Sequence, residues 1–125
     1  MKNIVKALLT LSILTTLTVG QSAIAETKIE AMVGTWKWAD FTIRVDKCAK
    51  TEVCAKVVTG PKNVGLQMIQ SKLQATGDSF VGKIAHPQTG DTYNSKISML
   101  STNVWHIDGC TAANVCASGD FKRIK

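Results

Sequence analysis

Apolar and polar residues alternate with a period of two along residues 35–124, and no helical period runs through this part of the chain. The clearest alternation covers residues 92–100, where Tyr93 and Ile97 share one face with Ser95. Turn-forming residues interrupt the pattern roughly every eight to twelve residues, which is typical of short strands joined by tight connections. The sequence therefore predicts an all-β fold.

The alternating stretches predict about eight short strands in sequence. An open meander of such strands has two exposed edges, and closure into a barrel removes them. We therefore expect a small eight-stranded antiparallel up-and-down barrel. Residues 26–32, which precede the barrel, could form a short helical turn. Residues 64–69, the fourth expected strand, are also compatible with a short helix. The expected strands cover residues 34–38, 41–46, 53–58, 64–69, 80–84, 92–100, 104–108 and 116–124.

The four cysteines occur as two copies of one spacing, Cys48-x5-Cys54 and Cys110-x5-Cys116. Four cysteines allow three pairings. Each pair flanks five mostly polar or small residues between two expected strands, which favours two local bridges across hairpins. A zinc site is the alternative, but structural zinc uses more closely spaced pairs, and a redox centre would use Cys-x-x-Cys.

Strand parity supports the local pairing. If Phe41 points inward, Cys48 has the opposite parity and points outward, because successive side chains of a strand lie on opposite faces. The other three cysteines likewise have the parity opposite to the inward-facing apolar residues of their strands. Both members of each pair thus lie on one face, as a bridge between strands requires.

Residues 1–25 have the layout of a secretory signal peptide. Lys2 and Lys6 give a basic start, residues 7–19 form an apolar stretch, and a small-x-small cleavage signal ends at Ala25. Cleavage before Glu26 would leave residues 26–125 as one domain of ordinary size. A lipoprotein anchor would need Cys at position 26. Without Lys2 and Lys6, the net charge of +6 becomes +4.

These features predict a periplasmic or secreted protein with a Gram-negative type signal peptide and no membrane anchor. No apolar stretch of spanning length follows Ala25. Nucleic acid is not an expected partner, because an exported chain does not meet it in the cytoplasm and the remaining basic residues are scattered.

Gly34-x-Trp36 on the first expected strand and Arg123 on the last resemble the lipocalin signature, in which the arginine packs across the tryptophan at the base of the barrel. A longer ordered set resembles the domain-of-unknown-function family 2147, whose members are small exported bacterial proteins. That resemblance covers about residues 33–124 and implies a lipocalin-like barrel, with no established activity. The set is Gly34-x-Trp36, Cys48, Cys54-x-Lys56-Val57, Gly65-Leu66, Phe80-x-Gly82-Lys83-Ile84, Pro87-x-x-Gly90-x-x-Tyr93-x-x-Lys96, Gly109-Cys110, Phe121 and Arg123.

Two interpretations of the barrel interior remain open. Small eight-stranded barrels are often just wide enough to be filled by their own side chains. Alternatively, one end holds a pocket with apolar walls and a few polar groups, here Tyr93 and Ser95, that orient a ligand. The candidate wall residues are Trp38, Phe41, Ile43, Val57, Phe80, Tyr93, Ile97 and Trp105.

The sequence offers little for catalysis. His106, with Asp108 two residues on, lies on an outer face, and His86 precedes Pro87 in a turn where a structural role is expected. No catalytic motif is present, and no two acidic residues are expected to converge inside the barrel. We therefore expect no enzyme activity, no cofactor and no metal site.

The leading hypothesis is an exported barrel that binds a small lipophilic or amphipathic ligand. The alternative is a protein-binding module, such as an inhibitor or immunity protein, with a periplasmic protein as its partner. In that case the disulfide-pinned loops 49–53 and 111–115 would form the contact surface, because a stiff loop loses little entropy on binding.

Overall fold

The computed structural model describes residues 28–125, and the expected signal peptide with its cleavage site lies outside them. A short 3-10 helix, η1, precedes eight strands. Their bounds are η1 Ile29–Met32, β1 Gly34–Trp38, β2 Phe41–Ala49, β3 Glu52–Thr59, β4 Gln74–Thr76, β5 Ser79–Ala85, β6 Thr92–Ser101, β7 Val104–Cys110 and β8 Cys116–Arg123.

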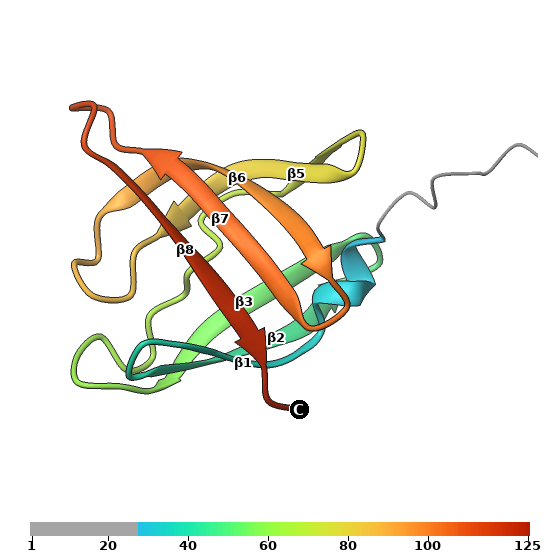
Figure 1. Cartoon of the computed structure of the whole chain (residues 1–125), viewed down its shortest axis with the longest axis horizontal. Coiled ribbons are helices and arrows are strands. Elements are labelled where there is room, and N and C mark those ends of the chain that lie inside the picture. Colours follow the sequence, from blue (N-terminus) through green and yellow to red (C-terminus); the bar gives the residue numbers. More distant parts are fainter. Residues whose placement is uncertain (1–27) are drawn as a thin grey trace, which may run out of the picture.

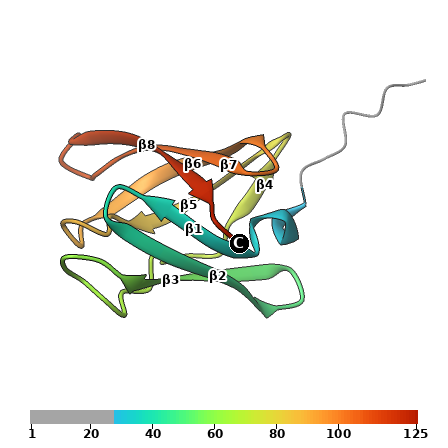
Figure 2. The same ribbon diagram turned by 60° about the horizontal axis from the view of Figure 1, so that its bottom comes forward.

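All eight strands belong to one antiparallel sheet with the order β3-β2-β1-β8-β7-β6-β5-β4. The first and last strands are neighbours, since Trp36 of β1 pairs with Arg123 of β8. The sheet curls into a half-barrel (Figure 1). Figure 2 shows β2 and β3 on one side of the interior, with β6, β7 and β8 on the other. The predicted all-β, antiparallel, eight-stranded fold is confirmed at this level.

One strand prediction was wrong. Residues 64–69 do not form a strand, and the fourth strand is instead Gln74–Thr76. Gly65 has a φ of +92°, which interrupts extended backbone. The segment also changes partner along its length. The Met68 N–H donates to the Ala55 carbonyl of β3 at 2.8 Å, while the Met68 carbonyl accepts from the Ala85 N–H of β5 at 2.7 Å. No single register can hold such a segment.

The antiparallel order gives the sheet two distinct ends. The base is the end that carries η1 and the turns 50–51, 77–78 and 102–103. The mouth is the opposite end, which carries the turn 39–40 and the loops 60–65, 86–91 and 111–115. In Figure 1 the base lies towards the right, beside η1, and the mouth lies towards the left.

A single hydrophobic cluster fills the interior between the two ends. Its side chains have the inward parity of their strands, so the alternation in the sequence is also the burial pattern of the fold. The fully buried members of greatest volume are Trp36, Trp105, Met32, Ile43, Met68, Ile97, Val45 and Val57. Among residues 28–125, no helix is long and apolar enough to cross a membrane.

Candidate functional site

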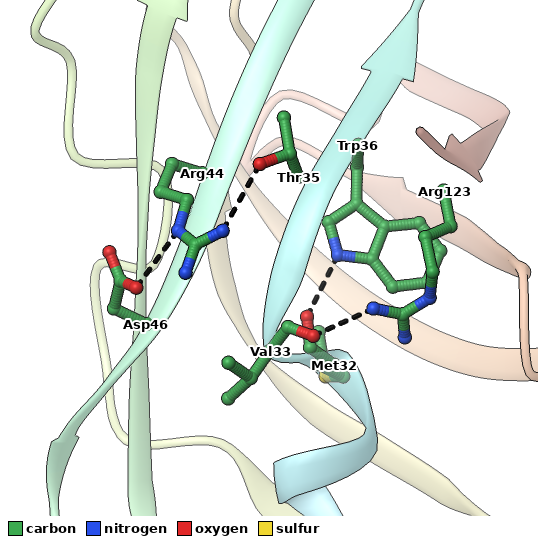
Figure 3. Close-up of polar contacts among 7 residues, drawn as sticks. All are labelled: Met32, Val33, Thr35, Trp36, Arg44, Asp46 and Arg123. Atoms are coloured by element: carbon green, nitrogen blue, oxygen red, sulfur yellow. Dashed lines mark hydrogen bonds and ion pairs between the residues drawn. The ribbon is translucent and has the colours of Figure 1, made fainter. Parts of the chain in front are cut away.

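The base of the sheet is sealed by Trp36 and Arg123. The Trp36 Nε1–H donates to the Met32 carbonyl of η1 at 2.8 Å. The Arg123 guanidinium lies 4.2 Å from the centre of the Trp36 ring and donates to the carbonyls of Val33 at 2.7 Å and Ala31 at 2.6 Å. Figure 3 shows Arg123 beside the indole, with its bond to Val33. This end therefore offers no entrance.

Gly34 explains why the arginine can reach this position. A Cβ atom at residue 34 would lie 2.2 Å from Arg123 Nη1, and the Gly34 φ of +150° also disfavours a side chain. The Gly-x-Trp pattern and the distant arginine therefore form one structural unit at the base.

The mouth, in contrast, holds a pocket of about 50 Å³ that is open to solvent on one side. Its walls are mainly apolar and aromatic, with hydroxyls and one imidazole among them. The lining residues are Trp38, Met68, Ile84, Ala85, His86, Pro87, Tyr93, Ser95, Ile107, Gly109, Ala117, Ser118, Gly119 and Phe121.

Aromatic contacts hold Trp38 in place beside this pocket. Its ring is nearly parallel to Phe41 and to Phe121, with centroid distances of 5.7 and 5.9 Å. His86 meets it edge-on at 5.1 Å and lies 5.6 Å from Tyr93. Because aromatic pairs at these separations stabilise one another, the rings form a preorganised wall.

The loop 86–91 forms the lip of the pocket and is internally bonded. The His86 N–H donates to the Asp91 carbonyl at 2.8 Å, and the Gln88 N–H donates to His86 Nδ1 at 3.1 Å. Asn63 of the neighbouring mouth loop donates through Nδ2 to the Pro87 carbonyl at 2.9 Å. The lip is therefore fixed both to itself and to the loop 60–65.

Burial lowers the pKa of His86 from its ordinary value, and the nearby Asp91 carboxylate opposes this shift. The imidazole is therefore neutral at pH 7. Because Nδ1 accepts a hydrogen bond from Gln88, the proton of the neutral ring is on Nε2. His86 thus presents an N–H donor.

The structure places only two of the predicted wall residues, Trp38 and Tyr93, in the pocket lining. The predicted orienting residue Ser95 also lines it, although its hydroxyl donates to the Tyr93 carbonyl at 3.1 Å. The other six are buried in the core and do not line the pocket: Phe41, Ile43, Val57, Phe80, Ile97 and Trp105.

The sequence interpretation missed His86 as a pocket residue and assigned it only to a turn. A usable signal was its position, two residues after the inward-facing Ile84, where parity directs it inward at the end of β5. The Gly109 and Gly119 contributions carried no such signal, because a glycine gives no information about the face it occupies.

Both predicted disulfides are confirmed, Cys48–Cys54 and Cys110–Cys116. Cys110 and Cys116 are directly opposite each other in the β7–β8 ladder, whereas the Cys48–Cys54 bridge spans an irregularity in the β2–β3 ladder. The first bridge lies towards the base and the second towards the mouth. The loops 49–53 and 111–115 therefore lie at opposite ends of the sheet.

On the outer face, the sequence suggested Asp108 as the neighbour of His106, but the structure pairs His106 with Asp120. Its Nδ1 lies 2.6 Å from Asp120 Oδ1, and both side chains are substantially exposed. Asp120 is directly opposite His106 in the β7–β8 ladder, and direct cross-strand neighbours are closer than residues two apart on one strand. Within residues 28–125, no three or more His, Cys, Asp or Glu side chains gather in a way that could hold a metal ion.

No protein-family model, curated protein or solved structure matches this chain. The fold and the two bridges define its class as a disulfide-bonded all-β protein, and the bridges indicate a non-cytoplasmic location.

Proposed function

We propose that this chain is an exported lipocalin-like barrel that binds a small amphipathic ligand at its mouth, and that it acts as a binding protein and not as an enzyme. The observation that carries the proposal is the contrast between the two ends. The base is sealed by Trp36 and Arg123, whereas the mouth holds an apolar pocket that is open to solvent. Pockets of this composition are the usual sites for small molecules.

Closure of the half-barrel is part of the proposal. The segment around Met68 bonds to Ala55 of β3 on one side and to Ala85 of β5 on the other. A segment bonded to both halves would complete the ring of backbone hydrogen bonds without a regular strand. The expected signal peptide at residues 1–25 and the resemblance to family 2147 support an exported, periplasmic or secreted, barrel of this kind.

The pocket volume limits the ligand. A dry apolar cavity of about 150 Å³ holds one benzene molecule. The mouth pocket, at about 50 Å³, has a third of that volume. It accommodates a group of a few heavy atoms and not a long acyl chain. The ligand therefore places a short apolar group against Met68 and Ile84 and keeps its polar part at the opening.

An NMR titration tests the proposal. Short-chain amphipathic compounds should shift the methyl signals of Met68 and Ile84, with the disulfides intact. Ala117→Val should weaken this binding, because Ala117 lines the pocket and the added methyl groups occupy its space. Thr76→Val, at the base end of β4, is the matched control and should leave the binding unchanged.

Mass spectrometry of the purified protein would identify any ligand retained from the cell. If no compound moves the pocket signals and none is retained, the proposal is wrong.

A protein partner is the second candidate, and one observation favours a contact at the mouth. Val115 is 58% exposed, although it lies in the loop pinned by Cys110 and Cys116. An apolar side chain on a stiff loop can contact a partner at little entropic cost. Because the loop 49–53 is at the other end, a single compact partner would contact one loop only. Capture from periplasmic extract, compared between the natural chain and Val115→Asp, tests this.

A further inference from the structure

Three hydrogen-bond donors at the mouth pocket have no acceptor within residues 28–125. They are the Trp38 Nε1–H, the Nε2–H of neutral His86 and the Tyr93 hydroxyl, and none of them takes part in a hydrogen bond of the described chain. All three residues line the same pocket of about 50 Å³. Their rings are consecutive, with His86 between Trp38 and Tyr93.

These donors also face accessible space. Trp105 Nε1 is the one fully buried side-chain polar atom without a partner in the described part of the chain. The donor atoms of Trp38, His86 and Tyr93 therefore each retain contact with solvent-accessible space, although Tyr93 as a whole is only 8% exposed.

The position of the indole donor is fixed by its neighbour on β8. A Cβ atom at Gly119 would lie 2.6 Å from Trp38 Nε1, and Gly119 itself lines the pocket. The N–H group of Trp38 is therefore at the pocket wall, while its ring stacks nearly parallel to Phe41 and to Phe121. The absence of a side chain at residue 119 is what gives this donor its place.

We propose that the ligand of the mouth pocket is a short-chain carboxylate, whose oxygens accept hydrogen bonds from Trp38, His86 and Tyr93. This inference rests on the proposed function and specifies the class of its ligand. A carboxylate has two oxygens with about four acceptor sites, which can take all three donors, whereas a single carbonyl oxygen has two. Hydrogen bonds to an ionised acceptor are also the stronger kind.

The composition of the pocket disfavours a cation. Its described lining includes no Asp or Glu, and the Trp38 ring already stacks nearly parallel to Phe41 and to Phe121. An ammonium group would therefore find no carboxylate among the residues that line the pocket, and it would have to compete with Phe41 and Phe121 for the Trp38 ring, whereas an open aromatic face is what favours cations. The alkyl part of a carboxylate, in contrast, fits against Met68 and Ile84.

The test is an NMR titration of the 15N-labelled, disulfide-bonded protein with butyrate and, separately, with butylammonium of equal chain length. Butyrate should move the indole N–H signal of Trp38. The Trp36 indole is an internal control, because it is already bonded to the Met32 carbonyl. Tyr93→Phe, which removes one donor and keeps the ring, should weaken butyrate binding about tenfold. Thr76→Val removes a hydroxyl at the base end and should not change the affinity for butyrate.

The outcomes separate this inference from the function on which it rests. If butyrate and butylammonium bind equally and move the Met68 and Ile84 methyl signals, the pocket binds ligands and the carboxylate assignment is wrong. If butyrate binds but Tyr93→Phe binds it as tightly, the donor set is wrong. If neither compound moves any pocket signal up to its solubility limit, the carboxylate assignment is overturned. The binding function is overturned as well if the other short-chain amphipathic compounds also leave the pocket signals unchanged and the purified protein retains no ligand.

Discussion

Replacing Arg123 by alanine should destabilise the protein far more than replacing Arg44. Arg44 donates to two side chains, Asp46 and Thr35 (Figure 3), whereas Arg123 donates to three backbone carbonyls, of which only the bond to Thr102, at 3.2 Å, is exposed. Arg123 bonds to the carbonyls of Val33 and Ala31, in a partly buried setting. Arg44 bonds to Asp46 at 2.9 Å, and these two side chains are 43% and 59% exposed. The difference in burial decides the difference in free energy.

The magnitude follows from the contacts at the base. A hydrogen bond to a charged group contributes about 1.5–3 kcal/mol, and partial exposure places each Arg123 bond at the lower end. The contact with the Trp36 ring adds about 0.5–1 kcal/mol. We expect Arg123→Ala to lower the free energy of unfolding by about 3–4 kcal/mol. Arg44→Ala should lower it by less than about 1 kcal/mol, as is usual for exposed ion pairs.

Thermal unfolding followed by circular dichroism measures this difference. For a domain of this size 1 kcal/mol corresponds to about 4–8 °C in Tm, so Arg123→Ala should lower Tm by about 12–30 °C. Arg44→Ala should lower it by no more than about 8 °C. Arg123→Lys keeps the charge but not the planar fork, and should give an intermediate loss. Equal losses for Arg123→Ala and Arg44→Ala would refute the argument that the arginine on β8 seals the base.

Three further predictions concern the mouth of the sheet. Replacing Cys110 and Cys116 by serine should lower the free energy of unfolding by about 2–2.5 kcal/mol in urea titrations, because the bridge closes a ring of about seven residues; a loss near zero would contradict this. The pKa of His86 in the folded state is below its ordinary value of 6.5, so the unfolded chain binds this proton more tightly than the folded chain does. The free energy of unfolding should therefore fall as the pH drops from about 6.5 through that lowered pKa. His86→Asn should flatten this part of the pH profile, measured by urea unfolding between pH 7.5 and 5, and an unchanged slope would contradict it. Gly119→Ala should cost about 1–3 kcal/mol in thermal unfolding and shift the indole N–H signal of Trp38, since the new Cβ would lie 2.6 Å from Nε1; an unmoved signal would be the opposing result.

Strand parity predicted much of the fold because it depends on one local rule: successive side chains of a strand lie on opposite faces of the sheet. The alternation around Tyr93 and Ile97 gave the inward face of β6 correctly, and the same rule placed all four cysteines outside. The rule works wherever a strand has one buried face and one exposed face. Signals of this kind are present in each strand's own residues.

The segment around Met68 shows where the rule stops. Its apolar residues resemble those of a strand, but its hydrogen bonds go first to β3 and then to β5. The choice of partner depends on where those two strands lie, and this information is absent from residues 64–69 themselves. The three residues of β4, by contrast, have no buried side chain and so gave no apolar signal at all.

The candidate site was predictable only in part for a related reason. Trp38 and Tyr93 are large, apolar and inward by parity, and the sequence identifies such residues. It cannot distinguish a wall residue from a core residue, because Ile43 and Trp105 have the same parity and are fully packed. Whether a side chain lines a pocket depends on what its neighbours leave unfilled.

The pairing of β1 with β8 has a consequence for the order in which the protein folds. The bond from Arg123 to the Val33 carbonyl joins residues 90 positions apart in the sequence, whereas each disulfide joins residues 6 apart. Hairpins such as β2–β3 and β7–β8 can form and oxidise early, while a contact between such distant residues carries a larger loop-closure cost. The disulfides therefore do little to shorten the slowest search. Docking of β8 beside β1 should be the late, rate-limiting event. In mixing experiments that begin from the oxidised, unfolded chain, refolding should therefore be slow although both bridges are already formed.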